Sequence, residues 1–374
     1  MACKVEDVIA IMEELAPLSL AEDWDNVGLL LGSSRSEVEG VLVSLDAQGE
    51  VLAEAGRRGA GLLICHHPPI FRPLYRVDTD EPAGSFIEQA LTSGISVYAA
   101  HTNLDGCKVG VNAALAEAVG LPRHRPLCPA PGKEGLKLVT FLPPGEAGRV
   151  SEALFEAGAG EIGEYGGCSF RVEGTGTFTP GPESHPAYGK AGETNRVREV
   201  RLEVVVSRRG LDAALKALVS SHPYEEPAYD IYSLRVPPAG GMGAVGELPQ
   251  ALELAELARV CSKALGNPDV RLAGDPRKSV RHVAVCGGSG GDLLPAAAEA
   301  GAEVMITGDV GYHKAVEAVI RGLAVIDAGH YHTERPVVAH LAALLEERTG
   351  AAGLQVRVYT SHVDTCPWTD GGGR

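Results

Sequence analysis

The sequence lacks the features typical of secreted, membrane-spanning and nucleic-acid-binding chains. No apolar run approaches the roughly 20 residues needed to cross a bilayer. The N-terminal residues include no basic segment followed by an apolar one, so no secretion signal is predicted. The formal net charge of -16 argues against broad binding to nucleic acid or to anionic membranes. We therefore expect a cytoplasmic protein without a membrane partner.

Paired cysteines are also lacking. The eight cysteines are scattered singly with no CxxC motif, which predicts neither a disulfide framework nor a thiolate zinc site. Hydrophobic residues make up 45% and charged residues 22%, which is ordinary for a globular protein. A length of 374 residues suits two domains better than a single core.

Apolar strands alternate with helices at both ends of the chain. In the first block, predicted strands at 41–47, 61–67 and 95–101 alternate with helices at 50–58 and 111–119. The same alternation returns after residue 241. Such βαβ units build a parallel sheet covered by helices on both faces. We therefore predict that residues 1–128 and 241–374 form one α/β domain around a single mixed, mainly parallel sheet.

The middle of the chain has a different order of elements. Prolines and glycines cluster in LPRHRPLCPAPGKEG and again in PPAGGMGAVGEL, as they do in connections between domains. Between these segments the pattern is strand, helix, strand, strand, helix, strand, which is the split-βαβ arrangement. Residues 129–240 are thus predicted to be an inserted α+β, ferredoxin-like domain.

Two predicted strands of the first block end at residues of the types that bind metals in proteins. The strand at 61–67 ends in His66 and His67, and the strand at 95–101 ends in His101, with Asp105 after a short turn. Adjacent residues on a strand point to opposite sides, so we expect the two histidines to serve two ions, or one ion and one supporting role. The alternatives are one packed and one solvated histidine, and a turn or cap role for Asp105.

A third set lies in VIDAGHYHTERPVV. Here His330 follows a strand, with Thr333 as a predicted N-cap and Pro336 in the first helical turn. Glu334 would then lie at a helix start, where the dipole favours a carboxylate. Simple capping explains Glu334 but leaves His330 unexplained. Imidazole and carboxylate ligands together suit Zn, Fe, Mn, Co or Ni, and two such ions are the usual device for activating water.

Weaker signals come from two further turns. Gly287 and Gly288 lie between a strand and a helix, where backbone N–H groups can receive phosphate, although a tight turn accounts for them equally well. Asp309 is a candidate for substrate binding or for helix capping. His101 and His313 are candidate general acid or base groups, because histidine titrates near neutrality.

Several motifs together strongly resemble the family of GTP cyclohydrolase 1 type 2 homologues, the Nif-three-like proteins. The matching stretches are AEDWDNVGLLLG, ICHHPPIF, AAHTNLD, MITGDVGYH and DAGHYHTE, which cover both outer blocks. The resemblance implies a toroidal homohexamer with two divalent ions per chain. It also implies five metal ligands, at His66, His67, Asp105, His330 and Glu334.

Two other segments bear on the resemblance. SHPYEEPAYDIY resembles the PII-like or CutA-like insertion of the longer family members. Where many members end in Thr-Asn-Pro-aromatic, this chain has Thr365-Cys366-Pro367-Trp368, a departure that concerns the local wall of the site. The implied activity is attack of metal-activated water on a purine nucleotide. The alternatives are a metal-dependent phosphoesterase and a non-catalytic metal-binding regulatory protein with a PII-like sensor domain.

Overall fold

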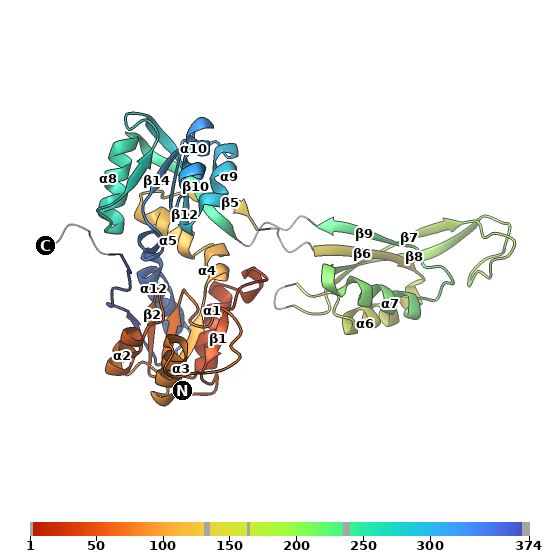
Figure 1. The fold of residues 1–374 in the computed structure, drawn as a ribbon. Coiled ribbons are helices and arrows are strands. Elements are labelled where there is room, and N and C mark those ends of the chain that lie inside the picture. Colours follow the sequence, from red (N-terminus) through yellow and green to blue (C-terminus); the bar gives the residue numbers. More distant parts are fainter. Residues whose placement is uncertain (1–2, 131–134, 163–164, 235–239, 369–374) are drawn as a thin grey trace. The chain divides into compact units, whose positions relative to one another are not determined.

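The computed structural model describes residues 3–130, 135–162, 165–234 and 240–368, and the chain divides into two compact units (Figure 1). Unit 1 comprises Met1–Ala130 together with Ala239–Arg374, and unit 2 comprises Pro131–Pro238. No helix in the described part of the chain is both long enough and apolar enough to span a membrane.

The first sheet of unit 1 has five strands in the order β1-β4-β3-β2-β15. Neighbouring strands are parallel except for β1, which pairs antiparallel with β4. The strands are β1 (Gly28–Leu31), β2 (Gly40–Ser44), β3 (Leu62–Cys65), β4 (Ser96–Ala99) and β15 (Arg357–Thr360).

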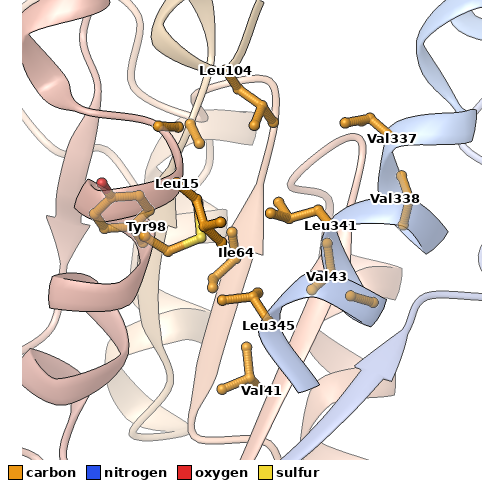
Figure 2. Close-up of a cluster of buried hydrophobic side chains, with 14 of the residues drawn as sticks. Leu15, Val41, Val43, Ile64, Tyr98, Leu104, Val337, Val338, Leu341 and Leu345 are labelled. Carbon is orange, nitrogen blue, oxygen red and sulfur yellow. The ribbon is translucent and has the colours of Figure 1, made fainter. Parts of the chain in front are cut away.

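Helices cover both faces of this sheet, so every residue of β2, β3 and β4 is buried. Helices α1 (Val5–Leu15) and α12 (Pro336–Ala351) pack on one face, and α2 (Gly49–Arg58) and α3 (Pro82–Thr92) on the other. Alternate strand residues face the two cores, as the pleat requires. Figure 2 shows the core of the first face, with strand residues Val41, Val43 and Ile64 beside Leu341 and Leu345 of α12, and Tyr98 beside Leu15 of α1.

The second sheet of unit 1 has six strands in the order β11-β14-β13-β12-β10-β5. Strands β12, β13 and β14 are parallel, and the outer strands pair antiparallel. Helices α5 (Val111–Ala118) and α8 (Leu254–Leu265) pack on one face, and α9 (Leu294–Glu299) and α10 (Tyr312–Ile320) on the other. The strands are β5 (His124–Pro129), β10 (Gly241–Glu253), β11 (Arg271–Ala273), β12 (Ser279–Ser289), β13 (Val304–Gly308) and β14 (Ala324–Asp327).

The predicted α/β class is confirmed, but the prediction of one shared sheet is wrong, because unit 1 contains two sheets. The two blocks exchange one strand each. The C-terminal β15 pairs with β2 of the first block, and β5 of the first block pairs with β10. Alternation of strands and helices in a sequence predicts the type of each element, but the pairing partner depends on long-range packing.

Strand β5 lies within one of the stretches predicted to connect domains, and β10 begins within the other. A Cβ atom at Gly241 would lie 2.3 Å from the carbonyl oxygen of Cys128, and one at Gly246 would lie 2.4 Å from that of Arg123. These glycines therefore allow close approach of β10 to the neighbouring backbone. The glycines of this segment thus belong to a strand and not to the linker that their composition had predicted.

Unit 2 is an antiparallel sheet with its own core. The sheet order is β7-β8-β6-β9, and the chain order of strands and helices is that of a split-βαβ unit. Both helices share a core with β6 and β8, which includes Leu138, Leu154, Leu202 and Leu218. The elements are β6 (Gly135–Leu142), α6 (Ala147–Glu156), β7 (Ser169–Phe178), β8 (Asn195–Ser207), α7 (Leu211–Ser221) and β9 (Tyr229–Leu234).

Candidate metal centre

Histidines from both sheets of unit 1 surround one buried carboxylate. Glu334 Oε2 lies 3.1 Å from His67 Nε2, and Glu334 Oε1 lies 3.2 Å from His330 Nε2. His66 Nε2 is 3.7 Å from the same Oε1 atom. His66 and His67 follow β3 of the first sheet, whereas the short helix α11 (His330–Glu334) follows β14 of the second. The cluster therefore forms where the two sheets meet.

The adjacent histidines converge, although the pleat of a strand predicted that they would point to opposite sides. They lie beyond the end of β3, where the backbone N–H groups of His66 and His67 both donate to the carbonyl of Leu45, at 3.0 and 2.9 Å. Because this backbone is a turn, strand alternation does not apply. The two ring centroids are 4.9 Å apart.

The local structure around Glu334 also differs from the prediction. Thr333 is not an N-cap: it is fully buried in α11, donates to the carbonyl of His330 and accepts a hydrogen bond from the Gly288 N–H. Glu334 ends α11 instead of starting a helix, and Pro336 begins α12 in the first helical turn as expected. His330 and Glu334 are four residues apart, which places them on the same face of α11.

Asp105 and His101 come to the same place from helix α4 (Thr102–Gly106) and the residue before it. Asp105 Oδ1 lies 3.7 Å from His66 Nε2. The His101 ring is 5.1 Å from that of His66 and 5.8 Å from that of His67. Among the described residues, two groups have ligand atoms within 4.8 Å of one another, namely His66, His67 and His101, and His67, His330 and Glu334. His67 belongs to both.

Each of the four histidines has an oxygen acceptor on Nδ1. An imidazole that donates from Nδ1 keeps the lone pair of Nε2 for a metal ion, and such outer partners fix the orientation of metal-binding histidines. The acceptors are Ala100 O for His66 (2.8 Å), Asp46 for His67 (2.7 Å), Asp25 for His101 (2.9 Å) and Asp309 for His330 (2.8 Å).

Two buried atoms of the cluster, His66 Nε2 and Glu334 Oε2, make no well-oriented hydrogen bond to any described residue, although Glu334 Oε2 lies 3.1 Å from His67 Nε2. Buried polar atoms without partners are costly and rare, so their presence calls for a ligand. The absence of a side chain at Gly288 leaves room for Glu334 and His330. A Cβ atom at this position would lie 2.2 Å from Glu334 Oε1 and 3.2 Å from His330 Nε2. The residues therefore fit metal cations.

The electrostatics of the cluster favour positive charge. Burial by itself lowers the pKa of His67, but the carboxylates of Asp46 and Glu334 outweigh burial and raise this pKa to about 10. Burial opposes ionisation of Glu334, yet the surrounding histidines hold its pKa well below the usual value. Burial raises the pKa of Asp105 to about 6. Protons on the imidazoles thus balance the carboxylates until a cation replaces them.

The weaker candidates occupy other roles or places. Asp309, with a positive φ of 54°, accepts from His330 and so orients a cluster residue. The N–H groups of Gly287 and Gly288 donate to Asn112 Oδ1 and Thr333 Oγ1, so they are not available to a phosphate. His313 is exposed at the start of α10, with its ring 5.3 Å from that of Tyr312, and it lies in neither ligand group.

Three residues have supporting roles that were not predicted from the sequence. Asp46 follows β2 just as the histidines follow β3, so its position at a strand end was a usable signal. Asp25 lies within the quoted AEDWDNVGLLLG motif, where its role was not predicted. Thr365 donates its hydroxyl hydrogen bond to Asp46 across 319 residues, a contact that no local pattern predicts. The segment that departs from the family pattern thus contacts the partner of His67.

Fold and site together define an α/β protein with a histidine and carboxylate cluster suited to metal cations. Residues 3–367 match the family described as Duf34/NIF3 (NGG1p interacting factor 3), and the chain belongs to this family. The resemblance inferred from the motifs is confirmed.

Curated relatives match over almost their whole length. The chain is 40% identical over 365 residues to the GTP cyclohydrolase 1 type 2 homolog of Bacillus subtilis (strain 168), covering 97% of this chain and 98% of that protein. It is 40% identical over 373 residues to the protein of the same name from Mycobacterium bovis, covering 98% of this chain and 97% of that protein.

Solved structures agree with this assignment. A Bacillus cereus protein related to NIF3 shares 38% identity with a TM-score of 0.74, and the match covers 99% of both chains. A Staphylococcus aureus protein shares 30% identity with a TM-score of 0.82, covering 98% of this chain and 99% of that one.

Proposed function

We propose that the chain is a dinuclear metal-dependent hydrolase of the GTP cyclohydrolase 1 type 2 kind, acting on a purine nucleotide. The observation that carries the proposal is the central position of Glu334, whose two carboxylate oxygens each face the Nε2 atom of a different histidine. A carboxylate placed in this way can bridge two cations. The relatives from Bacillus subtilis and Mycobacterium bovis are named GTP cyclohydrolase 1 type 2 homologs, which supports the choice of substrate class.

The residues divide into ligands and supports. The proposed ligands of the two divalent ions are His66, His67, Asp105, His330 and Glu334. When bound, a pair of ions at such a centre lowers the pKa of water and polarises an electrophile. Five protein ligands shared by two ions leave coordination positions open, as catalytic sites require.

The remaining histidine of the cluster, His101, is the proposed general base. Its Nδ1 is hydrogen-bonded to Asp25, which fixes the ring and leaves Nε2 for a proton, and His101 has a ring nitrogen within 4.8 Å of those of His66 and His67. A proton taken from a water molecule would reside on Nε2 of His101, next to the proposed metal ligands. His313 is not assigned a role in this mechanism, since it is exposed and outside both ligand groups.

The test is a panel of purine nucleotides and phosphoesters incubated with metal-loaded protein, with products identified by mass. His67→Ala is expected to abolish turnover and to leave the circular dichroism spectrum nearly unchanged. The matched control is His282→Ala, because His282 is a half-exposed histidine on β12 that pairs with Glu247 and lies outside both ligand groups. Turnover by His67→Ala at the wild-type rate would remove the cluster from the mechanism. Release of phosphate alone from every substrate would favour a phosphoesterase.

A metal-binding regulatory protein is the second candidate, and the separate core of unit 2 favours it. Unit 2 has its own sheet and helices, as a sensor domain would need. In this proposal, unit 2 is a PII-like or CutA-like domain. Binding of a nucleotide without turnover, together with full occupancy of the metal sites, would support regulation over hydrolysis.

We further propose that the chain assembles as a homohexamer in the cytoplasm. Helix α10 exposes an apolar stripe with the spacing of one helical face, and such a face is typical of an interface. Eight free cysteines suit a reducing compartment. Size-exclusion chromatography with light scattering tests the assembly, and Ile320→Glu is expected to shift it to smaller species. The stripe comprises Tyr312, Val316, Val319 and Ile320, which are 78%, 40%, 42% and 80% exposed.

A further inference from the structure

Two exposed aromatic side chains lie beside the histidine cluster. Trp24 is 61% exposed and Phe71 is 44% exposed. Their ring centroids are 5.9 Å apart, and both lie close to His101, at 6.3 Å for Trp24 and 6.2 Å for Phe71. The three rings meet edge to face, at interplanar angles of 62° to 83°, so none of them is stacked flat on another.

The loops that carry these two rings are fixed to the site and to each other. Next to Trp24, the fully buried carboxylate of Asp25 accepts hydrogen bonds from the His101 ring and from the backbone and hydroxyl of Thr102. The following residue, Asn26, donates to the carbonyl of Ile70, which directly precedes Phe71. These hydrogen bonds therefore hold the loops of the two exposed rings at a set distance from His101.

This arrangement is better suited to a ligand than to folding. A large aromatic side chain contributes most to stability when it is buried, yet both rings remain in contact with solvent beside the polar cluster. Held in place before binding, they lose little conformational freedom when a ligand arrives. Neither ring carries a charge, so the pair favours the flat face of an aromatic ring over a phosphate group.

We propose that Trp24 and Phe71 form a stacking platform for the planar heterocycle of the substrate. In this position a stacked purine base lies next to His101 and the cluster, with its ring atoms toward the proposed ligands. The inference rests on the proposed function for the class of substrate. It adds the residues that select a base-bearing compound over a simple phosphoester.

The test uses the tryptophan of the platform itself as the reporter. The chain has two tryptophans, and Trp368 is 84% exposed, so Trp368→Phe leaves Trp24 as the single tryptophan at little cost to the fold. Zinc-loaded Trp368→Phe protein is titrated with GTP, ATP and guanosine, and in parallel with inorganic triphosphate, which has no ring. Excitation at the red edge of tryptophan absorption limits absorption by the bases.

We expect saturable quenching of Trp24 by the ring-bearing probes and none by triphosphate. Adding Phe71→Ala should weaken the apparent affinity roughly tenfold to a hundredfold, because one stacking partner is lost. The matched control is Phe170→Ala, which removes a phenylalanine of unit 2 that is 64% exposed. For hydrolysis, Trp24→Leu should raise KM, whereas Trp24→Phe, which keeps an aromatic ring, should have a KM close to that of the wild type.

The outcomes separate this inference from the proposed function. Quenching without hydrolysis of any nucleotide would leave the platform standing and would refute the hydrolase. Hydrolysis without saturable quenching by any ring-bearing probe would refute the platform alone. Emission from Trp24 that iodide cannot quench in ligand-free protein would also refute it, because a second copy of the chain would then cover the rings.

Discussion

Replacement of Gly288 by alanine tests whether the cluster is spaced for metal ions. Gly288 lies at a φ of +64°, and the added Cβ atom would lie 2.2 Å from Glu334 Oε1. The neighbouring atom belongs to a side chain, so the carboxylate moves and the fold persists. Relief of the contact requires a shift of about 1 Å, whereas metal–ligand distances tolerate only about 0.2 Å. We therefore expect metal affinity to fall about 100-fold or more, beyond the effect of losing an outer partner.

Gly266→Ala is the matched control. Gly266 has a φ of +69°, but a Cβ atom there meets nothing within 4 Å. Both variants bear the same backbone strain of about 1–2 kcal/mol, so both should lower the melting temperature by similar amounts. Zinc affinity is measured by competition with a chromophoric chelator, beside thermal unfolding. Wild-type affinity in Gly288→Ala, or equal loss of affinity in both variants, would refute the reasoning.

Three further predictions concern a support of the site, a proposed ligand and a buried carboxylate elsewhere in unit 1. Asp46→Asn should lower metal affinity by about 10-fold to 100-fold, because the Nδ1 partner of His67 is weakened; Asp292→Asn, at a side chain 90% exposed, should not change it in the same chelator competition. In the metal-free protein, the stability that protonated His67 contributes is complete below its unfolded pKa of about 6.5 and is lost as the pH rises through about 10. Zinc binding near neutral pH should therefore release a proton, seen as a binding enthalpy that depends on the buffer, and a buffer-independent enthalpy would contradict it. Glu54→Gln should cost about 1.5–3 kcal/mol of stability by chemical unfolding, because the buried carboxylate accepts from Ser361 and the His362 N–H, while exposed Glu50→Gln should cost little.

The local elements of unit 1 could be predicted from the sequence, because helix and strand periodicity are local properties. The segments at 111–119 and 61–67 illustrate this, since α5 and β3 lie within them. The sheets could not be predicted, since the pairing of β15 with β2 joins residues more than 300 positions apart. Strand β10 was missed because its glycines serve close packing against β5.

For the candidate site, residue types were easier to predict than their arrangement. The strand-end pattern drew attention to His66, His67 and His330, and the structure brings all three around Glu334. Their directions were not predictable, because the turn after β3 and the short helix α11 override strand alternation and capping rules. The hydroxyl contact of Thr365 with Asp46 depends on the path of the whole chain.

The most direct test of the central claim is an anomalous difference map at the zinc edge from crystals of the zinc-loaded protein. The account predicts two peaks about 3.5–4 Å apart, the usual spacing of a two-metal site, on either side of the Glu334 carboxylate. One peak would contradict the dinuclear assignment. No peak near His66, His67 and His330 in a folded, zinc-loaded crystal would contradict the metal centre itself.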